Sequence, residues 1–397
     1  MRVLIATVTA GAGHLQAASA LEEAWRAMRP RDSVEKLDVL DFTSRLYRKL
    51  YIESYVALVE HAPELWAHVF KRTDDPERIR KLARLRRAWS QITTSRFVTH
   101  LQKLRPEVMI CTHYMPSEII SAVKDEMKRP PFTSTVVTDF EAHALWMQPG
   151  VDLYFVAAEE TKARLVARGL SKERVVVTGI PVSGRFANVG DRAEIRKCLG
   201  LRDDLPVLLV LGGGFGMGPV EEILHELNKV SILMQVMVVC GRNEELRREV
   251  AVIDCKHPTR VYGFVTNMQE LMAASDLVIT KPGGLTSSEA LALGKPIFVL
   301  NPIPGQEAAN SDFLLEYGAA TKANRLEDLP FRLEKLLGSS KLDEMARIAA
   351  QLGRPHAARD ICKEILRRVN EPEIPKPKRQ IPEKSQTSGF QDAAPTR

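Results

Sequence analysis

The 397-residue chain repeats one pattern of hydrophobic and polar positions: short apolar runs separated by longer amphipathic stretches. Short apolar runs bounded by turn residues predict buried strands, and the stretches between them have the length of crossover helices. Such alternation is typical of parallel sheets covered by helices on both faces. The predicted strands are residues 3–8, 34–38, 108–112, 133–138, 153–156 and 175–178, then 205–211, 234–240, 260–262, 277–280 and 296–300.

The alternation restarts after Ile180-Pro181-Val182-Ser183, which divides the chain into two units. Its length also exceeds the usual size of one domain. The sequence therefore predicts an α/β protein of two tandem Rossmann-like domains, residues 1–182 and 183–340, with a ligand cleft between them. From residue 371 onward Pro, Lys, Gln and Ser dominate, so residues 371–397 are expected to form a disordered tail.

Composition narrows the cellular setting. The 45% of apolar residues is ordinary for a globular protein and sufficient for two cores. The five cysteines are scattered without C-x-x-C spacing, which argues against a disulfide framework or zinc site and favours a reducing cytoplasm. Residues 1–8 are too short an apolar run for a signal peptide, and no run approaches the roughly 20 residues of a membrane-spanning helix. Any membrane contact is therefore expected to be peripheral.

Positive charge is concentrated in one segment. Residues 71–105 contain eleven Lys and Arg against three acids, a net charge of +8, whereas the whole chain carries +6. Arg80, Arg84 and Arg87 belong to this segment. Such a local excess indicates an anionic partner and says little about the fold.

An aromatic stretch precedes the basic segment. Tyr47, Tyr51 and Tyr55 recur every four residues and so share one face of a helix, and Trp66 follows. Core packing alone also explains such a face. Beside dense positive charge, however, aromatic and aliphatic residues favour a membrane surface with anionic lipids. Nucleic acid is the less favoured anion, because the sequence shows no recognised nucleic-acid-binding module.

Residues 281–310 carry the densest set of candidate ligand-binding residues. A Pro-Gly-Gly turn leads from a strand into a helix over residues 286–293, and such a turn leaves backbone N–H groups available for phosphate. Glu289 lies one turn inside this helix, where its carboxylate can accept hydrogen bonds from a ribose diol. An ordinary βαβ unit explains the glycines, but not the acid and the polar cluster that follows the next strand. The candidate residues are Pro282, Gly283, Gly284, Thr286, Ser287, Glu289, Gln306, Glu307 and Asn310.

A second glycine-rich loop, residues 212–218, follows the first predicted strand of the second domain. Dense glycine lets the backbone approach a pyrophosphate closely, with a flexible turn as the alternative. Its candidate ligand-binding residues are Gly213, Gly214 and Phe215. The chain has no G-x-x-x-x-G-K-[ST] segment, and neither glycine-rich turn has the third glycine of the dinucleotide motif. P-loop ATPases and standard NAD enzymes therefore fit poorly.

Candidate acid–base residues lie in the first domain. His14 follows a glycine-rich turn at the start of a helix, whose N-terminus favours a neutral imidazole. Asp139 ends a β-branched strand, where open α/β sheets bind their ligands. Each is a plausible base for an acceptor hydroxyl, and the sequence does not rank them. His143 and Trp146 follow closely and either shape an acceptor pocket or support the loop.

Together these motifs resemble one known family. Residues 281–310 resemble the donor-sugar signature of the MurG-like glycosyltransferases, family 28, which have the GT-B fold. The segments TAGAGH at 9–14 and VTDFEAHALW at 137–146 are similar to those of one branch, the monogalactosyldiacylglycerol synthases and processive diacylglycerol glucosyltransferases. The resemblance extends over residues 1–369.

The resemblance implies an inverting transfer of glucose or galactose from a UDP-sugar to 1,2-diacylglycerol, at the inner face of the cell membrane. It also implies that residues 341–370 pack back on the first domain. The sequence lacks an Asp-x-Asp motif, so neither a metal nor another cofactor is expected. The resemblance assigns Gly263, Phe264 and Val265 to the uracil, Gln306 to the sugar, and Gly11, Gly13, His143 and Trp146 to the acceptor side.

Two other functions stay open at this point. A UDP-N-acetylglucosamine 2-epimerase-like enzyme shares the fold and donor site, but it needs no lipid surface. A non-catalytic scaffold that senses lipid or UDP-sugar keeps the nucleotide site without turnover.

Overall fold

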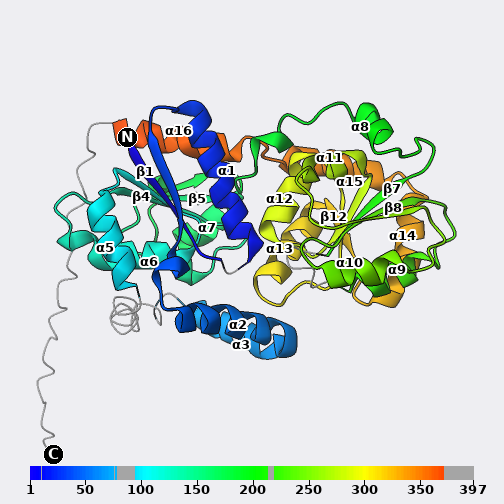
Figure 1. Ribbon diagram of the computed structural model, residues 1–397, viewed down its shortest axis with the longest axis horizontal. Helices are drawn as coiled ribbons and strands as arrows, with labels where there is room; N and C mark the ends of the chain where they lie inside the picture. Colours follow the sequence, from blue (N-terminus) through cyan, green and yellow to red (C-terminus); the bar gives the residue numbers. More distant parts are fainter. Residues whose placement is uncertain (10, 76, 78–93, 213–218, 371–397) are drawn as a thin grey trace, which may run out of the picture.

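The structure, a computed structural model, describes residues 1–9, 11–75, 77, 94–212 and 219–370. The chain forms two six-stranded parallel sheets, one in each half, with helices on both faces (Figure 1). The predicted α/β fold of two Rossmann-like units is confirmed. The domain boundaries themselves stay a prediction.

The first sheet has the strand order β2-β1-β3-β4-β5-β6. Its central strands are buried on both faces: Val3 and Ile5 of β1 pack toward α1 and α16, whereas Leu4 and Ala6 pack toward α5 and α6. This double burial explains the nearly continuous apolar runs. The elements are β1 (Arg2–Thr7), α1 (Ala12–Met28), β2 (Ser33–Asp38), α2 (Arg45–His61), α3 (Pro63–Thr73), α5 (Ser95–Leu104), β3 (Val108–Cys111), α6 (Tyr114–Val123), β4 (Phe132–Val136), β5 (Leu153–Val156), α7 (Glu159–Ala167) and β6 (Val175–Val177).

The second sheet has the strand order β12-β11-β10-β7-β8-β9. Counted from β7, this is the 3-2-1-4-5-6 order of the dinucleotide-binding fold. Its elements are α8 (Arg192–Cys198), β7 (Val207–Leu211), α9 (Val220–Leu227), β8 (Gln235–Val239), α10 (Glu244–Ala251), β9 (Thr259–Tyr262), α11 (Met268–Ala274), β10 (Leu277–Thr280), α12 (Gly284–Ala292), β11 (Ile297–Val299), α13 (Gln306–Tyr317), β12 (Ala320–Lys322) and α14 (Leu329–Leu337).

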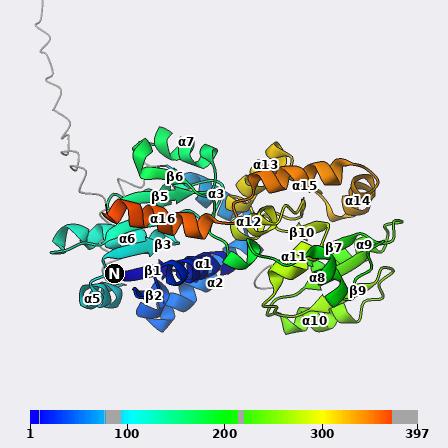
Figure 2. The same ribbon diagram turned by 90° about the horizontal axis from the view of Figure 1, so that it is seen from above.

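The sequence pattern missed β12, because its three residues, Ala-Thr-Lys, form no apolar run and β12 is an edge strand. The last two helices divide between the sheets. Helix α15 (Lys341–Leu352) contributes Met345 and Ala349 to cores of the second sheet, whereas α16 (Ala357–Asn370) packs along α1 on the first (Figure 2). The return to the first domain is therefore made by α16, and the tail expected to be disordered lies outside the described residues.

Helices α2 and α3 pack against each other and project from the first domain below the junction of the two halves (Figure 1). The end of α3 is tied to the loop after β4. Arg168 forms two bonds of 2.7 and 2.6 Å to Asp74, which also accepts from Ala144 N–H at 2.7 Å. Burial alone would raise the pKa of the Asp74 carboxyl, but the bond from Arg168 outweighs this effect and the pKa is lowered. This half-buried ion pair fixes where the hairpin of α2 and α3 leaves the domain.

The carboxyl ends of the two sheets face each other across the junction. The turn before α12 lies so close to the end of β4 that a Cβ on Gly284 would collide with the Thr138 carbonyl. On α13, Phe313 stacks on Phe140 with ring centroids 4.4 Å apart. Because parallel sheets bind ligands at their carboxyl ends, this arrangement places both candidate half-sites in one cleft.

Candidate active site

The strand orders explain which residues meet in the cleft. In the first sheet, the connections leave in opposite directions from the adjacent strands β1 and β3, and ligands bind at such a switch point. The turn after β1 leads to His14, and β3 leads directly to Thr112 and His113. In the second sheet, the corresponding point lies between β7 and β10, and the Pro-Gly-Gly turn follows β10.

Three helices begin at the cleft with a glycine at the N-cap: Gly11 before α1, Gly283 before α12 and Gly305 before α13. Among the residues that the structure describes, no side chain caps any of these three N-termini. The first-turn N–H groups of a helix lack intrahelical partners and carry partial positive charge. The cleft is therefore suited to an anion such as a diphosphate.

The His14 ring is held by two oxygens at its Nδ1 atom. The Thr112 carbonyl and the Thr138 hydroxyl each lie 2.9 Å from Nδ1. A carbonyl oxygen only accepts, so Nδ1 must carry the proton and Nε2 the lone pair. Burial lowers the pKa of His14, while the nearby charge of Asp139 raises it. A neutral imidazole with a lone pair at Nε2 is the form that a general base requires.

His113 is a site residue that the sequence reasoning missed. It is buried beside His14, with ring centroids 4.8 Å apart in an edge-to-face arrangement. Its Nδ1 accepts the Met115 N–H at 3.1 Å at the start of α6, so its proton must be on Nε2. Burial, followed by the charge of His14, keeps the pKa of His113 well below its usual value. The segment Thr-His-Tyr after an apolar strand was the available signal, because it places a histidine at the carboxyl end of β3.

Asp139 lies at the end of β4, within the electrostatic reach of His14. Its Oδ1 accepts a 3.0 Å hydrogen bond from Asn310 Nδ2, which comes from the second domain. Burial raises the pKa of Asp139, whereas the Asn310 bond and the charge of His14 lower it. Asn310 was expected among the donor-sugar residues, but its amide forms hydrogen bonds with the first domain.

Glu289 is half-buried on α12 and has no hydrogen-bond partner among the described residues. Burial raises the pKa of its carboxyl to about 8. In the same helix, Ser287 is fully buried, and its hydroxyl has no hydrogen-bond partner in the described part of the chain. Thr286 is half-buried. An unbonded acid beside a helix N-terminus is prepared to accept hydrogen bonds from a ligand.

The loop after β11 delivers the start of α13, as expected. Gln306 and Glu307 are both half-buried in the first turn of this helix. Glu307 Oε2 accepts the Ile303 N–H at 2.8 Å, and burial raises the pKa of the Glu307 carboxyl despite the nearby charge of Lys281. The charge of Asp139, from the first domain, also raises the pKa of the Glu307 carboxyl, so Glu307 lies within the electrostatic reach of that domain.

Gly263, Phe264 and Val265 follow β9 at the same sheet edge. Phe264 is 60% exposed, with the Arg242 guanidinium 5.0 Å from its ring centroid, so it is not a core residue. Val265 is half-buried against the core of the second sheet. A Cβ on Gly263 would lie 3.1 Å from Glu244 Oε1, the end of an exposed side chain.

The acceptor-side candidates fall into two groups. Gly13 contacts Leu285 of α12, Gly11 has φ 131°, and Trp146 is buried 6.2 Å from His14. His143 supports the loop: Leu145 N–H donates to its Nδ1, which leaves Nε2–H to donate to the Phe70 carbonyl at 3.0 Å. It therefore ties α3 to the loop after β4.

Two tyrosines of α2, Tyr47 and Tyr51, turn inward. Tyr47 and Tyr51 pack against the first-domain core, and the Tyr51 hydroxyl lies 3.4 Å from that of Tyr114. Trp66 is half-buried, 5.9 Å from the Phe70 ring. This placement differs from the expected contact of these rings with lipid. Gly213, Gly214, Phe215, Arg80, Arg84 and Arg87, with the side chain of Tyr55, lie outside the described part of the chain.

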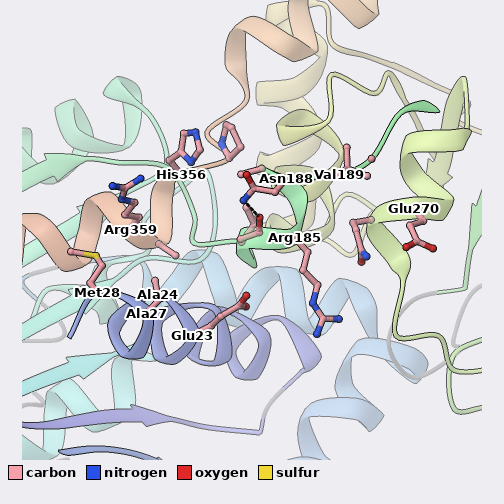
Figure 3. A pocket seen from close by; sticks show the side chains of 17 residues that line it. Glu23, Ala24, Ala27, Met28, Arg185, Asn188, Val189, Glu270, His356 and Arg359 are labelled. Atoms are coloured by element: carbon pink, nitrogen blue, oxygen red, sulfur yellow. Dashed lines mark hydrogen bonds between the residues drawn. The ribbon is translucent and has the colours of Figure 1, made fainter. Parts of the chain in front are cut away.

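A separate cavity of about 750 Å³ lies where the connection between the domains passes α1 and α16 (Figure 3). Glu23 of α1, Arg185 of the connection, Glu270 of α11 and Arg359 of α16 are among its lining residues. None of the predicted site residues that the structure describes lines it. The cleft with His14 and Glu289 is therefore the candidate active site.

Two family models match the chain. Residues 14–182 match the model described as monogalactosyldiacylglycerol (MGDG) synthase, and residues 207–365 match the glycosyltransferase family 28 C-terminal domain. The chain is 32% identical over 377 residues to a processive diacylglycerol β-glucosyltransferase of Bacillus mycoides, covering 92% of this chain and 93% of that protein. It is 32% identical over 384 residues to monogalactosyldiacylglycerol synthase 2 of Arabidopsis thaliana, covering 91% of this chain and 80% of the relative.

Solved structures share the fold at low identity. MurG of Acinetobacter baumannii superposes with a TM-score of 0.59 at 15% identity, covering 92% of this chain and 99% of that one. The S. aureus MnaA–UDP structure superposes with a TM-score of 0.60 at 13% identity, covering 93% and 97%. The two sheets and their arrangement are thus those of the MurG-like GT-B fold.

The two histidines of the site are predicted to hold opposite tautomers between pH 6 and 8. In ¹⁵N-histidine-labelled protein, NMR should show His14 protonated at Nδ1, because a carbonyl oxygen faces that atom. It should show His113 protonated at Nε2, because a backbone N–H donates to the Nδ1 of His113. His14→Gln and His113→Gln variants assign the signals. A lone pair at Nδ1 of His14 would contradict the hydrogen-bond assignment.

Proposed function

Because the chain belongs to the family of the monogalactosyldiacylglycerol synthases and processive diacylglycerol glucosyltransferases, we propose that it transfers glucose or galactose from a UDP-sugar to 1,2-diacylglycerol. The observation that carries the proposal is the meeting of His14 with the uncapped N-termini of α12 and α13 across one cleft. The sequence relatives give no support to the epimerase or scaffold alternatives.

The donor is proposed to bind on the second domain. Glu289 would accept hydrogen bonds from the ribose diol, and the Gly263–Val265 loop would meet the uracil. The first-turn N–H groups of α12 and α13 would face the diphosphate, where they stabilise the charge that develops on the leaving UDP. This positive potential is why we propose a transfer that needs no metal.

His14 is proposed to be the base. Its Nε2 lone pair takes the proton of the acceptor hydroxyl while that oxygen bonds to the anomeric carbon and the bond from this carbon to UDP breaks. Attack from the face opposite UDP inverts the anomeric centre. Asp139 then stabilises the imidazolium through its charge, which already raises the pKa of His14. The sequence did not distinguish between His14 and Asp139 as the base, and we propose His14 for this role.

Access to a lipid acceptor is proposed to use α2 and α3. Leu46 and Leu50 on α2, and Leu65 on α3, are 68%, 57% and 56% exposed. Among the described residues, no helix is long and apolar enough to cross a membrane. These side chains can be buried among lipid tails, while the basic segment of the sequence adds attraction to anionic lipids of the inner leaflet. The protein would then act as a peripheral enzyme on the cytoplasmic side.

Glu289 is predicted to couple UDP binding to pH. In the unliganded protein the pKa of the Glu289 carboxyl is about 8. Hydrogen bonds from the ribose hydroxyls favour its ionised form, so UDP binding releases a proton. The affinity for UDP therefore rises with pH up to about 8. Calorimetry should show that Glu289→Gln weakens UDP binding by about 1.5–3 kcal/mol at pH 8. The variant should also lack the rise of UDP affinity that the titration of Glu289 causes. The UDP phosphate titrates equally in both proteins. An unchanged affinity in a folded variant would remove Glu289 from the site.

Turnover is predicted to depend on His14. His14→Asn should lower kcat by about 10²–10⁴-fold in an assay with radiolabelled UDP-sugars and diacylglycerol vesicles, while UDP affinity changes little. The extracted lipid also identifies the sugar and the number of sugars added. If His14→Asn keeps near-normal turnover and Asp139→Asn abolishes it, Asp139 is the base instead.

Vesicle binding is predicted to need the exposed leucines. The Leu46→Ser, Leu50→Ser, Leu65→Ser triple variant should bind anionic vesicles at least about tenfold more weakly, because each leucine loses favourable transfer from water to lipid. Phe331→Ser is the matched control, since Phe331 is 71% exposed on α14 of the second domain. Flotation of the triple variant at the wild-type level would show that another surface contacts lipid.

A further inference from the structure

Asn310 connects the two domains through both atoms of its amide. It is fully buried on α13, its Nδ2 donates to Asp139 Oδ1 at 3.0 Å, and its Oδ1 accepts the Phe140 N–H at 2.8 Å. A backbone N–H only donates, so the Phe140 bond fixes which end of the amide is oxygen. The NH₂ group must therefore face the Asp139 carboxyl.

These bonds exist only while the domains are in contact. The surrounding interface is tight: Phe313 stacks on Phe140, and Gly284 allows the Thr138 carbonyl to approach α12. Separation of the two halves by a few ångströms would break both bonds of the Asn310 amide. The two hydrogen bonds of the amide therefore form only when the cleft is closed.

Closure places Asp139 in an unfavourable setting for a charge. The titratable groups that interact electrostatically with Asp139 are His14 of α1 and Glu307 of α13. His113 interacts in turn with His14, and Lys281 with Glu307. Glu307 is a like charge, and burial disfavours an ionised carboxyl. Against these effects stand the hydrogen bond from Asn310 and the charge of His14. A hydrogen bond donated to a carboxylate stabilises its ionised form.

We propose that Asn310 is a positioning residue, whose amide keeps Asp139 ionised and oriented beside His14 when the cleft closes. The base is then fully supported only when the donor domain is docked on the acceptor domain. This coupling rests on the proposed function, because the imidazolium that Asp139 stabilises arises when His14 takes the acceptor proton. It gives α13 a role in catalysis besides holding the sugar donor.

The first test is the pH profile of turnover. Without the amide donor, Asp139 takes up a proton at higher pH, so activity should be lost earlier as pH falls. In Asn310→Leu and Asn310→Ala, the acid limb of kcat should move upward by about one pH unit or more, with a smaller change in KM for the UDP-sugar. Phe313→Leu is the matched control, because it weakens the same interface without touching Asp139, and its acid limb should stay at the wild-type position.

The second test does not depend on turnover. Where the folded state holds a proton that the unfolded chain releases, stability falls as pH rises. The difference in Tm between wild type and each Asn310 variant should therefore widen from pH 4 to pH 8, whereas the Phe313→Leu difference should stay constant. Asn310→Ala removes the same donor and adds neither bulk nor a titrating group, so it covers the case in which Asn310→Leu does not fold.

Three outcomes separate the proposals. Shifted acid limbs together with widening Tm differences support the positioning role. Tm differences that do not change with pH, or acid limbs that match wild type, overturn it and leave Asn310 a structural residue. A wild type that transfers no sugar to diacylglycerol overturns the proposed function, and the Tm series then still decides whether Asn310 holds Asp139 ionised.

Discussion

Contact between the carboxyl ends of two parallel sheets is the constraint on which the site depends. Each sheet alone presents half of the required chemistry: the first has two histidines and an aspartate, and the second has the uncapped helix N-termini and Glu289. Gly284 permits the approach because any side chain there would collide with the Thr138 carbonyl. Gly284 thus serves the contact between the domains, besides its proposed place in a phosphate-binding turn.

The same closure sets the ionisation of the site. Desolvation is the largest effect on His14, His113, Asp139, Glu289 and Glu307. It favours neutral forms of all of them, so each charge that the reaction needs must be stabilised by a neighbour or by the ligand. Asn310 supplies that neighbour for Asp139, and the bound nucleotide is proposed to supply it for Glu289. The opposite tautomers of the adjacent histidines provide one lone pair and one N–H within the same small space.

Helices α2 and α3, proposed to contact lipid, are tied to this cleft by specific bonds. Asp74 and His143 tie the end of α3 to the loop that follows Asp139, and Phe70 packs over Gly305 at the start of α13. These bonds fix the position of the hairpin of α2 and α3 relative to the loop that carries Asp139. Tyr47 and Tyr51 hold this hairpin to the core, whereas its leucines at 46, 50 and 65 stay exposed.

The sequence by itself determined the alternation of strands and helices, because buried parallel strands need continuous apolar runs and their turns need glycine at defined positions. It also indicated His14, Asp139 and Glu289, since the carboxyl ends of such strands are where ligands bind. It missed β12, whose three residues carry no apolar signal, and His113, whose importance depends on the adjacency of β1 and β3. Only the tertiary structure decided which way the tyrosines of α2 face, that α15 and α16 pack on different domains, and that Asn310 reaches Asp139. Those outcomes depend on contacts between residues far apart in the chain, and local periodicity contains no information about such contacts.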